Sequence, residues 1–196
     1  MDGFAKALLP LSQPPSAPAW NHAEITGVLG TTKRRPAAVL LGVRDDADPR
    51  LILTVRNGHL HAHAGQVAFP GGRSEPDDGG ALATALRESH EEVGLDPALV
   101  TPLGYLDCLE TISGYCVTPV VATVAADAAL RASPSEVAEV FEVPLAFFLD
   151  PGNQHRYTMD YHGYRRDMLE FVHGGHRIWG ATAAILLNLL KRMGHA

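Results

Sequence analysis

The sequence is poor in cysteine, in long apolar runs and in positive charge. Its two cysteines, Cys108 and Cys116, lack metal-site spacing and are too few for a disulfide framework, so we expect reduced thiols in a cytoplasmic protein. No stretch reaches the ~18 apolar residues of a membrane span, so we expect no membrane partner. Leu8 and Leu9 do not start a long apolar core, so we expect no secretory signal. The net charge of −6 argues against a nucleic-acid partner, since nucleic-acid scaffolds carry a basic surface.

The bulk composition is that of an ordinary folded domain. Apolar residues make up 46% and charged residues 19% of 196 residues, which is large enough for one domain with a substantial core. Residues 1–20 hold four prolines and are expected to form an N-terminal arm, poorly ordered or packed on a partner subunit. We expect residues 21–196 to form a single domain.

Apolar runs with β-branched residues alternate with turn sequences along this domain. Residues 37–43 and 51–55 flank an Asp- and Pro-rich turn and predict an antiparallel pair. Further strands are expected at 66–69, 100–109, 116–124 and 139–143, with a hairpin formed by 156–161 and 168–171. Helical spacing predicts helices over 80–93 and 178–190, and a helical turn over 144–148. This order indicates an α+β fold.

The predicted helix over residues 80–93 carries three carboxylates close together. Glu88, Glu91 and Glu92 have the spacing i, i+3, i+4, which places them on one helix face within about one turn. Their repulsion destabilises a helix, and a hard cation such as Mg²⁺ or Mn²⁺ would offset it. The alternative is a solvated acidic face. The apolar side chains expected to face the core, on another side, are Leu82, Leu86 and Val93.

Residues 72–95 resemble the Nudix box, in which a glycine and an acidic residue precede Arg-Glu-x-x-Glu-Glu-x-Gly. Gly72 begins the motif, Asp78 stands where a Glu is usual, and residues 87–95 supply the rest. Ser89 replaces an apolar residue, and one extra residue separates Asp78 from Arg87. The resemblance implies the Nudix fold, a mixed β-sheet sandwiched between α-helices. It also implies hydrolysis of a nucleoside diphosphate linked to another group.

Residues 53–72 resemble the motif that precedes the box in one Nudix branch, the coenzyme A pyrophosphatases. Leu53, Thr54, Arg56, Gly65 and residues 69–72 fit that motif. The extra box residue, the Asp and the C-terminal run 176–187 are also similar to that branch. Two positions depart from the motif, where Asn57 replaces a Ser and His61 replaces an Arg.

The resemblance assigns roles to these residues. It implies that Mg²⁺ or Mn²⁺ is bound by the side chains of Glu88, Glu91 and Glu92 and by the backbone carbonyl of Gly71. Glycine permits the tight turn and the close approach of backbone to an ion. Arg87 is expected to orient the box carboxylates by ion pairing.

Substrate contacts and the base follow from the same resemblance. Arg56, His61 and Gly72 are expected to line the phosphate site, although neutral His61 would make affinity weaker or pH-dependent. The base that activates water is either a box glutamate, Glu88 or Glu91, or an acid on a distant loop, for which Glu136 is our candidate and Glu110 its rival.

The sequence therefore predicts a metal-dependent Nudix pyrophosphohydrolase. Its substrate would be coenzyme A or acyl-coenzyme A, and the products 3′,5′-ADP and (acyl-)4′-phosphopantetheine. One alternative is a Nudix hydrolase of another nucleotide such as ADP-ribose or NADH. A second alternative is a catalytically silent ligand sensor, against which the intact carboxylate cluster argues. The resemblance also points to a homodimer as the assembly to test.

Overall fold

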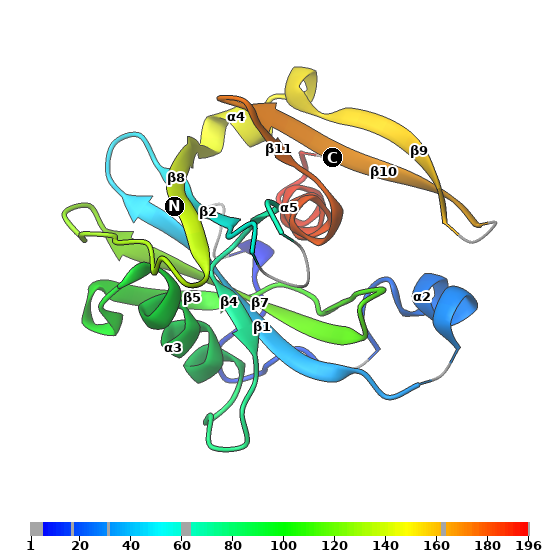
Figure 1. The fold of residues 1–196 in the computed structure, drawn as a ribbon, viewed down its shortest axis with the longest axis horizontal. Coiled ribbons are helices and arrows are strands. Elements are labelled where there is room, and N and C mark those ends of the chain that lie inside the picture. The colour runs from blue at the N-terminus through cyan, green and yellow to red at the C-terminus, as the bar shows by residue number, and fades with distance from the viewer. Residues whose placement is uncertain (1–5, 17, 31, 60–63, 162–163, 196) are drawn as a thin grey trace.

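The computed structural model describes residues 6–16, 18–30, 32–59, 64–161 and 164–195 (Figure 1). The strands are β1 (Arg35–Asp45), β2 (Arg50–Arg56), β3 (Val67–Ala68), β4 (Gly71–Arg73), β5 (Val100–Tyr105), β6 (Leu109–Glu110), β7 (Tyr115–Ala125), β8 (Val137–Pro144), β9 (His155–Tyr161), β10 (Tyr164–His173) and β11 (His176–Ile178). The α-helices are α2 (His22–Leu29), α3 (Ala81–Val93), α4 (Leu145–Leu149) and α5 (Gly180–Arg192).

The main sheet is mixed and is centred on β1. Its strand order is β3-β2-β1-β7-β5, with β4 added to β1, β6 to β7 and β8 to β2. β1 runs parallel to β7 along its whole length and antiparallel to β2 and β4. The pairing of β1 with β2 confirms the predicted antiparallel pair.

Alternation along β1 supplies the two faces of this sheet. Leu41 and Val43 belong to the apolar cluster that contains Leu186 of α5, whereas Leu40 belongs to the cluster that contains Ala85 of α3. Because successive side chains of a strand point to opposite faces, α3 and α5 lie on opposite sides of the sheet (Figure 1). This arrangement confirms the predicted α+β fold, a mixed sheet between helices.

A three-stranded antiparallel sheet, β11-β10-β9, packs on the outer side of α5 (Figure 1). Tyr164 pairs with Tyr161 at the closed end of the β9–β10 hairpin, in agreement with the predicted hairpin. Phe171 of β10 and Phe148 of α4 are buried against each other with ring centroids 5.1 Å apart. The helix α5 is therefore enclosed by two sheets.

The N-terminal segment packs on the domain. Leu9 and Tyr105 exchange two backbone hydrogen bonds of 2.8 and 2.9 Å, and Ala7 and Leu8 are buried. Farther along, the backbone N–H of Trp20 donates to the Cys108 carbonyl at 3.1 Å. Among the described residues, no helix is both long enough and apolar enough to cross a membrane.

The orientation of α3 differs from the prediction in one respect. Val93 is buried as expected and Leu82 packs against the core, but Leu86 is only half-buried. Glu92, predicted to lie with the other carboxylates away from the core, is 2% exposed. One carboxylate of α3, that of Glu92, is therefore buried rather than exposed to solvent.

Candidate active site

Glu92 lies in the last turn of α3, just before Gly94 ends the helix in a left-handed conformation. Its Oε2 accepts a hydrogen bond of 3.0 Å from the backbone N–H of Gly71, and its Oε1 lies 3.4 Å from Nη1 of Arg56. Burial outweighs these two contacts and raises the pKa of Glu92 to about 7. Glu92 therefore connects the box to the motif of residues 53–72 through its contacts with Arg56 and Gly71.

The guanidinium group of Arg56 has one N–H donor without a hydrogen-bond partner among the described residues. Arg56 closes β2, and this donor, its Nε, is buried. A buried unpaired donor costs free energy unless a ligand satisfies it, and a guanidinium fork suits phosphate oxygens. This orphan donor favours the predicted phosphate contact.

The adjacent glycines Gly71 and Gly72 both lie in close contact with other parts of the chain. Gly71 has φ +148°, and a Cβ there would overlap backbone atoms of Ala38 and Val39 on β1. A Cβ at Gly72 would overlap the carboxylate of Glu88. Gly72 therefore leaves the space in which the Glu88 carboxylate lies.

Arg87 holds three acids at once. Its Nε and Nη2 form a two-pronged ion pair with Asp78 at 2.9 and 3.0 Å, while Nη1 lies 3.0 Å from both Glu88 and Glu91. Nη2 also donates to the Arg73 carbonyl at 3.1 Å. This geometry fits the predicted role of Arg87 in orienting the box carboxylates.

Asp78 anchors that arrangement. Its Oδ2 accepts hydrogen bonds from the N–H of Glu75 at 2.8 Å and the hydroxyl of Thr84 at 2.9 Å. The bonds from Arg87 hold the pKa of Asp78 well below its usual range. The motif identifies Asp78 as the acid that stands where a Glu is usual, and the structure adds its ion pair with Arg87.

Glu136 lies exposed in the turn before β8, and the departing residue Asn57 holds that turn. The Asn57 N–H donates to the Glu136 carbonyl at 2.8 Å, and its side-chain amide donates to the Pro134 carbonyl at 2.7 Å. The charge of Glu136 contributes to raising the pKa values of Glu88 and Glu92. The negative charge of Glu136 therefore acts on the box carboxylates.

The carboxylate of the rival base, Glu110, is paired with two other side chains. Its two carboxylate oxygens lie 2.7 Å from Nδ1 of His22 and 3.2 Å from Nε of Arg34, and its side chain is 7% exposed. Its backbone exchanges two hydrogen bonds with the side chain of Asn21. This pairing favours Glu136 as the free acid.

The carboxylates fit a divalent cation by their chemistry. Glu88, Glu92 and Glu136 repel one another, and burial raises the pKa of Glu88. Within the described ranges no three His, Cys, Asp or Glu side chains are already arranged to hold a metal ion, and the guanidinium groups of Arg87 and Arg56 lie against Glu88 and Glu92. A cation would take over the neutralising role of the guanidinium groups. His61, predicted to contact phosphate, lies outside the described residues.

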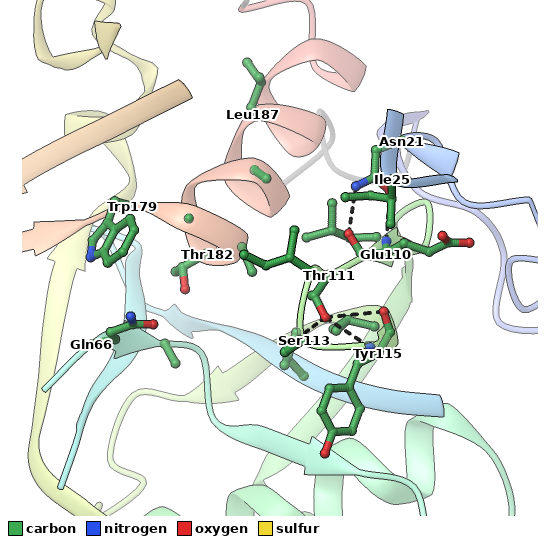
Figure 2. A pocket seen from close by; sticks show the side chains of 18 of the residues that line it. Asn21, Ile25, Gln66, Glu110, Thr111, Ser113, Tyr115, Trp179, Thr182 and Leu187 are labelled. Atoms are coloured by element: carbon green, nitrogen blue, oxygen red, sulfur yellow. Dashed lines mark hydrogen bonds between the residues drawn. The ribbon is translucent and has the colours of Figure 1, made fainter. Parts of the chain in front are cut away.

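A cavity of about 880 Å³ adjoins this site on the α5 side of the sheet (Figure 2). Arg56, Gly71 and Gly72 line it, which places the motif residues on its wall. Other walls come from β1, β3, β9, β10, α2, the loop between β6 and β7, and α5. Sequence reasoning did not find this cavity, because its walls are far apart in the chain.

Comparison with known proteins gives a consistent result. A NUDIX domain family model matches residues 33–161. Over 164 residues the chain is 41% identical to an uncharacterized Nudix hydrolase, NudL, of Escherichia coli (strain K12 / DH10B), covering 84% of this chain and 85% of that protein. A protein of the same name from Photorhabdus laumondii is 41% identical over 159 residues, covering 81% of this chain and 85% of that protein.

Solved structures share the fold. A MutT/nudix family protein from Enterococcus faecalis superposes with a TM-score of 0.54 at 15% identity, covering 84% of this chain and 63% of that one. A Nudix hydrolase from M. smegmatis, RenU, gives a TM-score of 0.50 at 24% identity, covering 60% of this chain and 74% of that one. At these identities the similarity concerns the fold alone.

Proposed function

The chain belongs to the Nudix hydrolase family, and from this premise we propose that it hydrolyses the diphosphate bond of coenzyme A or acyl-coenzyme A. Water adds to one phosphorus of the bridge, the bond from that phosphorus to the bridging oxygen breaks, and a proton leaves the water. The products are 3′,5′-ADP and 4′-phosphopantetheine or its acyl form.

The observation that carries the proposal is the buried Nε of Arg56, which has no hydrogen-bond partner among the described residues. Arg56 lines the cavity, and its ion-pair partner Glu92 lies 36 positions away in the sequence. Arg56 supplies an unused phosphate donor where the coenzyme A motif and the box meet. The match of residues 53–72 to that motif supports coenzyme A as the nucleotide.

The residues fit a bound Mg²⁺ or Mn²⁺, which would be held by Glu88, Glu91, Glu92 and the Gly71 carbonyl. When bound, the cation would neutralise charge on the diphosphate and make the attacking water more acidic. Arg87 orients Glu88 and Glu91 through its ion pairs. Arg56 contacts a phosphate oxygen, and Gly72 allows that phosphate close to the backbone.

Glu136 takes the proton from the attacking water in this proposal. It is exposed, and Asn57 holds the turn that carries it. Its negative charge contributes to raising the pKa values of Glu88 and Glu92. A base needs such access to the reacting water, and ion pairing deprives Glu110 of it.

Product analysis tests the function. The protein is incubated with coenzyme A and Mg²⁺ or Mn²⁺, with ADP-ribose and NADH in parallel. Release of 3′,5′-ADP faster than turnover of the other two supports the proposal. Preference for ADP-ribose or NADH keeps the family and overturns the substrate. Binding of coenzyme A without turnover of any of the three would indicate a sensor.

A further inference from the structure

The cavity lined by Gly71 and Gly72 is also lined by the apolar side chains of Trp20, Ile25, Ile112 and Leu187, which we call the apolar compartment. β1 runs under it: Val39 pairs with Gly71 at one end of this stretch, and Arg35 pairs with Tyr115 at the other. Figure 2 shows Ile25 above Thr111 and Tyr115, on the side away from Gln66 and Trp179, and Leu187 farther along α5 than Thr182. The compartment is thus continuous with the candidate active site but distant from it along the strand.

Several of its polar residues already have partners within the protein, and the cations Lys191 and Arg35 also line the cavity. The side chain of Asn21 exchanges hydrogen bonds of 2.8 and 2.9 Å with the backbone of Glu110. The carboxylate of Glu110 is taken by His22 and Arg34. The hydroxyl of Thr111 bonds within its own turn (Figure 2). A ligand group lying beside Asn21, Glu110 or Thr111 gains little hydrogen bonding, so an apolar group is favoured there.

Two of the apolar side chains of the compartment are exposed, and Trp20 has contacts that position it. Trp20 and Ile112 are each 40% exposed, and both are among the large apolar residues most exposed in the described chain. The ammonium of Lys191 lies 5.7 Å from the centre of the Trp20 ring, and the backbone N–H of Trp20 donates to the Cys108 carbonyl. An occupant that covers these side chains would bury apolar surface at little cost in ordering.

Most of this compartment lies outside the common domain. The family model matches residues 33–161, whereas Trp20 and Ile25 precede it and Leu187 follows it. The hydrolytic box lies within the matched range, so these added walls bear on what is bound rather than on bond cleavage.

We propose that this compartment holds the acyl chain of a long-chain acyl-coenzyme A, so that the enzyme prefers acyl thioesters to free coenzyme A. The inference rests on the proposed function, because the acyl group must reach the compartment while its diphosphate lies at the box. Each methylene moved out of water contributes about a fourfold gain in affinity. A dodecanoyl chain with only part of its length enclosed would therefore raise kcat/KM by about tenfold or more over coenzyme A.

The test measures kcat/KM for coenzyme A and its acetyl, hexanoyl and dodecanoyl thioesters. The affinity of chelator-treated protein for the same compounds is measured by calorimetry. The matched variants are Ile112→Ser and Leu99→Ser, since both residues are apolar, Leu99 is 38% exposed, and Leu99 does not line the cavity. A third variant, Leu187→Trp, places a larger side chain in the compartment and is assayed in the same way if it folds.

We expect kcat/KM and affinity to rise with chain length in the wild type. The dodecanoyl-to-coenzyme A ratio should fall at least about fivefold in Ile112→Ser and stay high in Leu99→Ser. Turnover of coenzyme A with no gain from the acyl chain, or equal effects of the two serine variants, overturns this inference and leaves the proposed function standing. Absence of turnover with every thioester and with coenzyme A overturns the proposed function itself.

Discussion

Arg56 Nη1 lies 3.4 Å from Oε1 of Glu92, so the end of β2 meets the last turn of α3 through an ion pair of which Glu92 is almost wholly buried. The same carboxylate accepts the Gly71 N–H. These contacts connect the two sequence motifs. They also explain why the buried acid of α3 is tolerated, since both its oxygens have a partner.

Glu92→Gln should abolish metal-dependent turnover, with a loss of at least about 100-fold, while the fold is kept. The substitution removes a ligand charge at nearly constant shape. Turnover on the substrate identified by product analysis and far-UV circular dichroism check the two halves of this expectation. A rate close to that of the wild type would remove Glu92 from the metal site.

The pKa of Glu92 also gives the metal-free protein a pH-dependent stability. Its pKa is near 4.5 in an unfolded chain and about 7 in the folded one, so the folded state holds the extra proton between these values. Stability contributed by Glu92 is therefore lost as pH rises from about 4.5 to 7. Relative to Glu92→Gln, the wild type should lose about 3 kcal/mol over this window in urea unfolding with chelator present. A difference independent of pH would contradict the pKa shift.

Much of the fold follows from local patterns, and the exceptions have identifiable causes. The β1–β2 pair, the β9–β10 hairpin and α5 were predicted because apolar periodicity marks them. β4 was missed because Gly71 and Gly72 have no strand preference, and pairing with β1 alone makes it a strand. α2 was missed because only Ile25 of its side chains is buried, too few to make a pattern.

The candidate site was predictable in identity more than in arrangement. The family motif located Arg87, Glu88 and Glu92 in the chain, but helix spacing placed Glu92 with the exposed acids. Tertiary contacts with Arg56 and Gly71 override that expectation. The cavity could not be predicted, since Trp20 and Leu187 meet in it only after folding.

Asp78→Asn should lower the stability at pH 7 by about 2 kcal/mol, because it breaks the charged pair with Arg87. The pKa of Asp78 is lowered on folding, so its contribution is present above the unfolded value near 4 and is lost progressively as pH falls below it. The difference from wild type in thermal unfolding should accordingly be smaller at pH 3 than at pH 7. The control is Asp77→Asn, at an exposed neighbour. An equal effect of both substitutions would deny Asp78 its anchoring role.

Gly72→Ala should weaken metal binding by at least about tenfold while changing stability little. The added Cβ meets the carboxylate of Glu88, the mobile end of a flexible side chain, which moves aside at small cost. Gly79→Ala is the matched control, because a Cβ there meets nothing within 4 Å. Mn²⁺ titration followed by calorimetry should separate the two variants. Wild-type affinity in Gly72→Ala would show that the Glu88 carboxylate does not need this position.

The identity of the base can be tested through Asn57. If Glu136 takes the proton from water, Glu136→Gln should lower kcat by about 100-fold or more. Asn57→Ala, which frees the turn that carries Glu136, should lower kcat by about tenfold. Glu110→Gln should instead cost stability, because it breaks the pairs with His22 and Arg34, and should keep kcat close to that of the wild type. The opposite pattern, with kcat lost only in Glu110→Gln, would assign the base to Glu110 and leave Asn57 a purely structural residue.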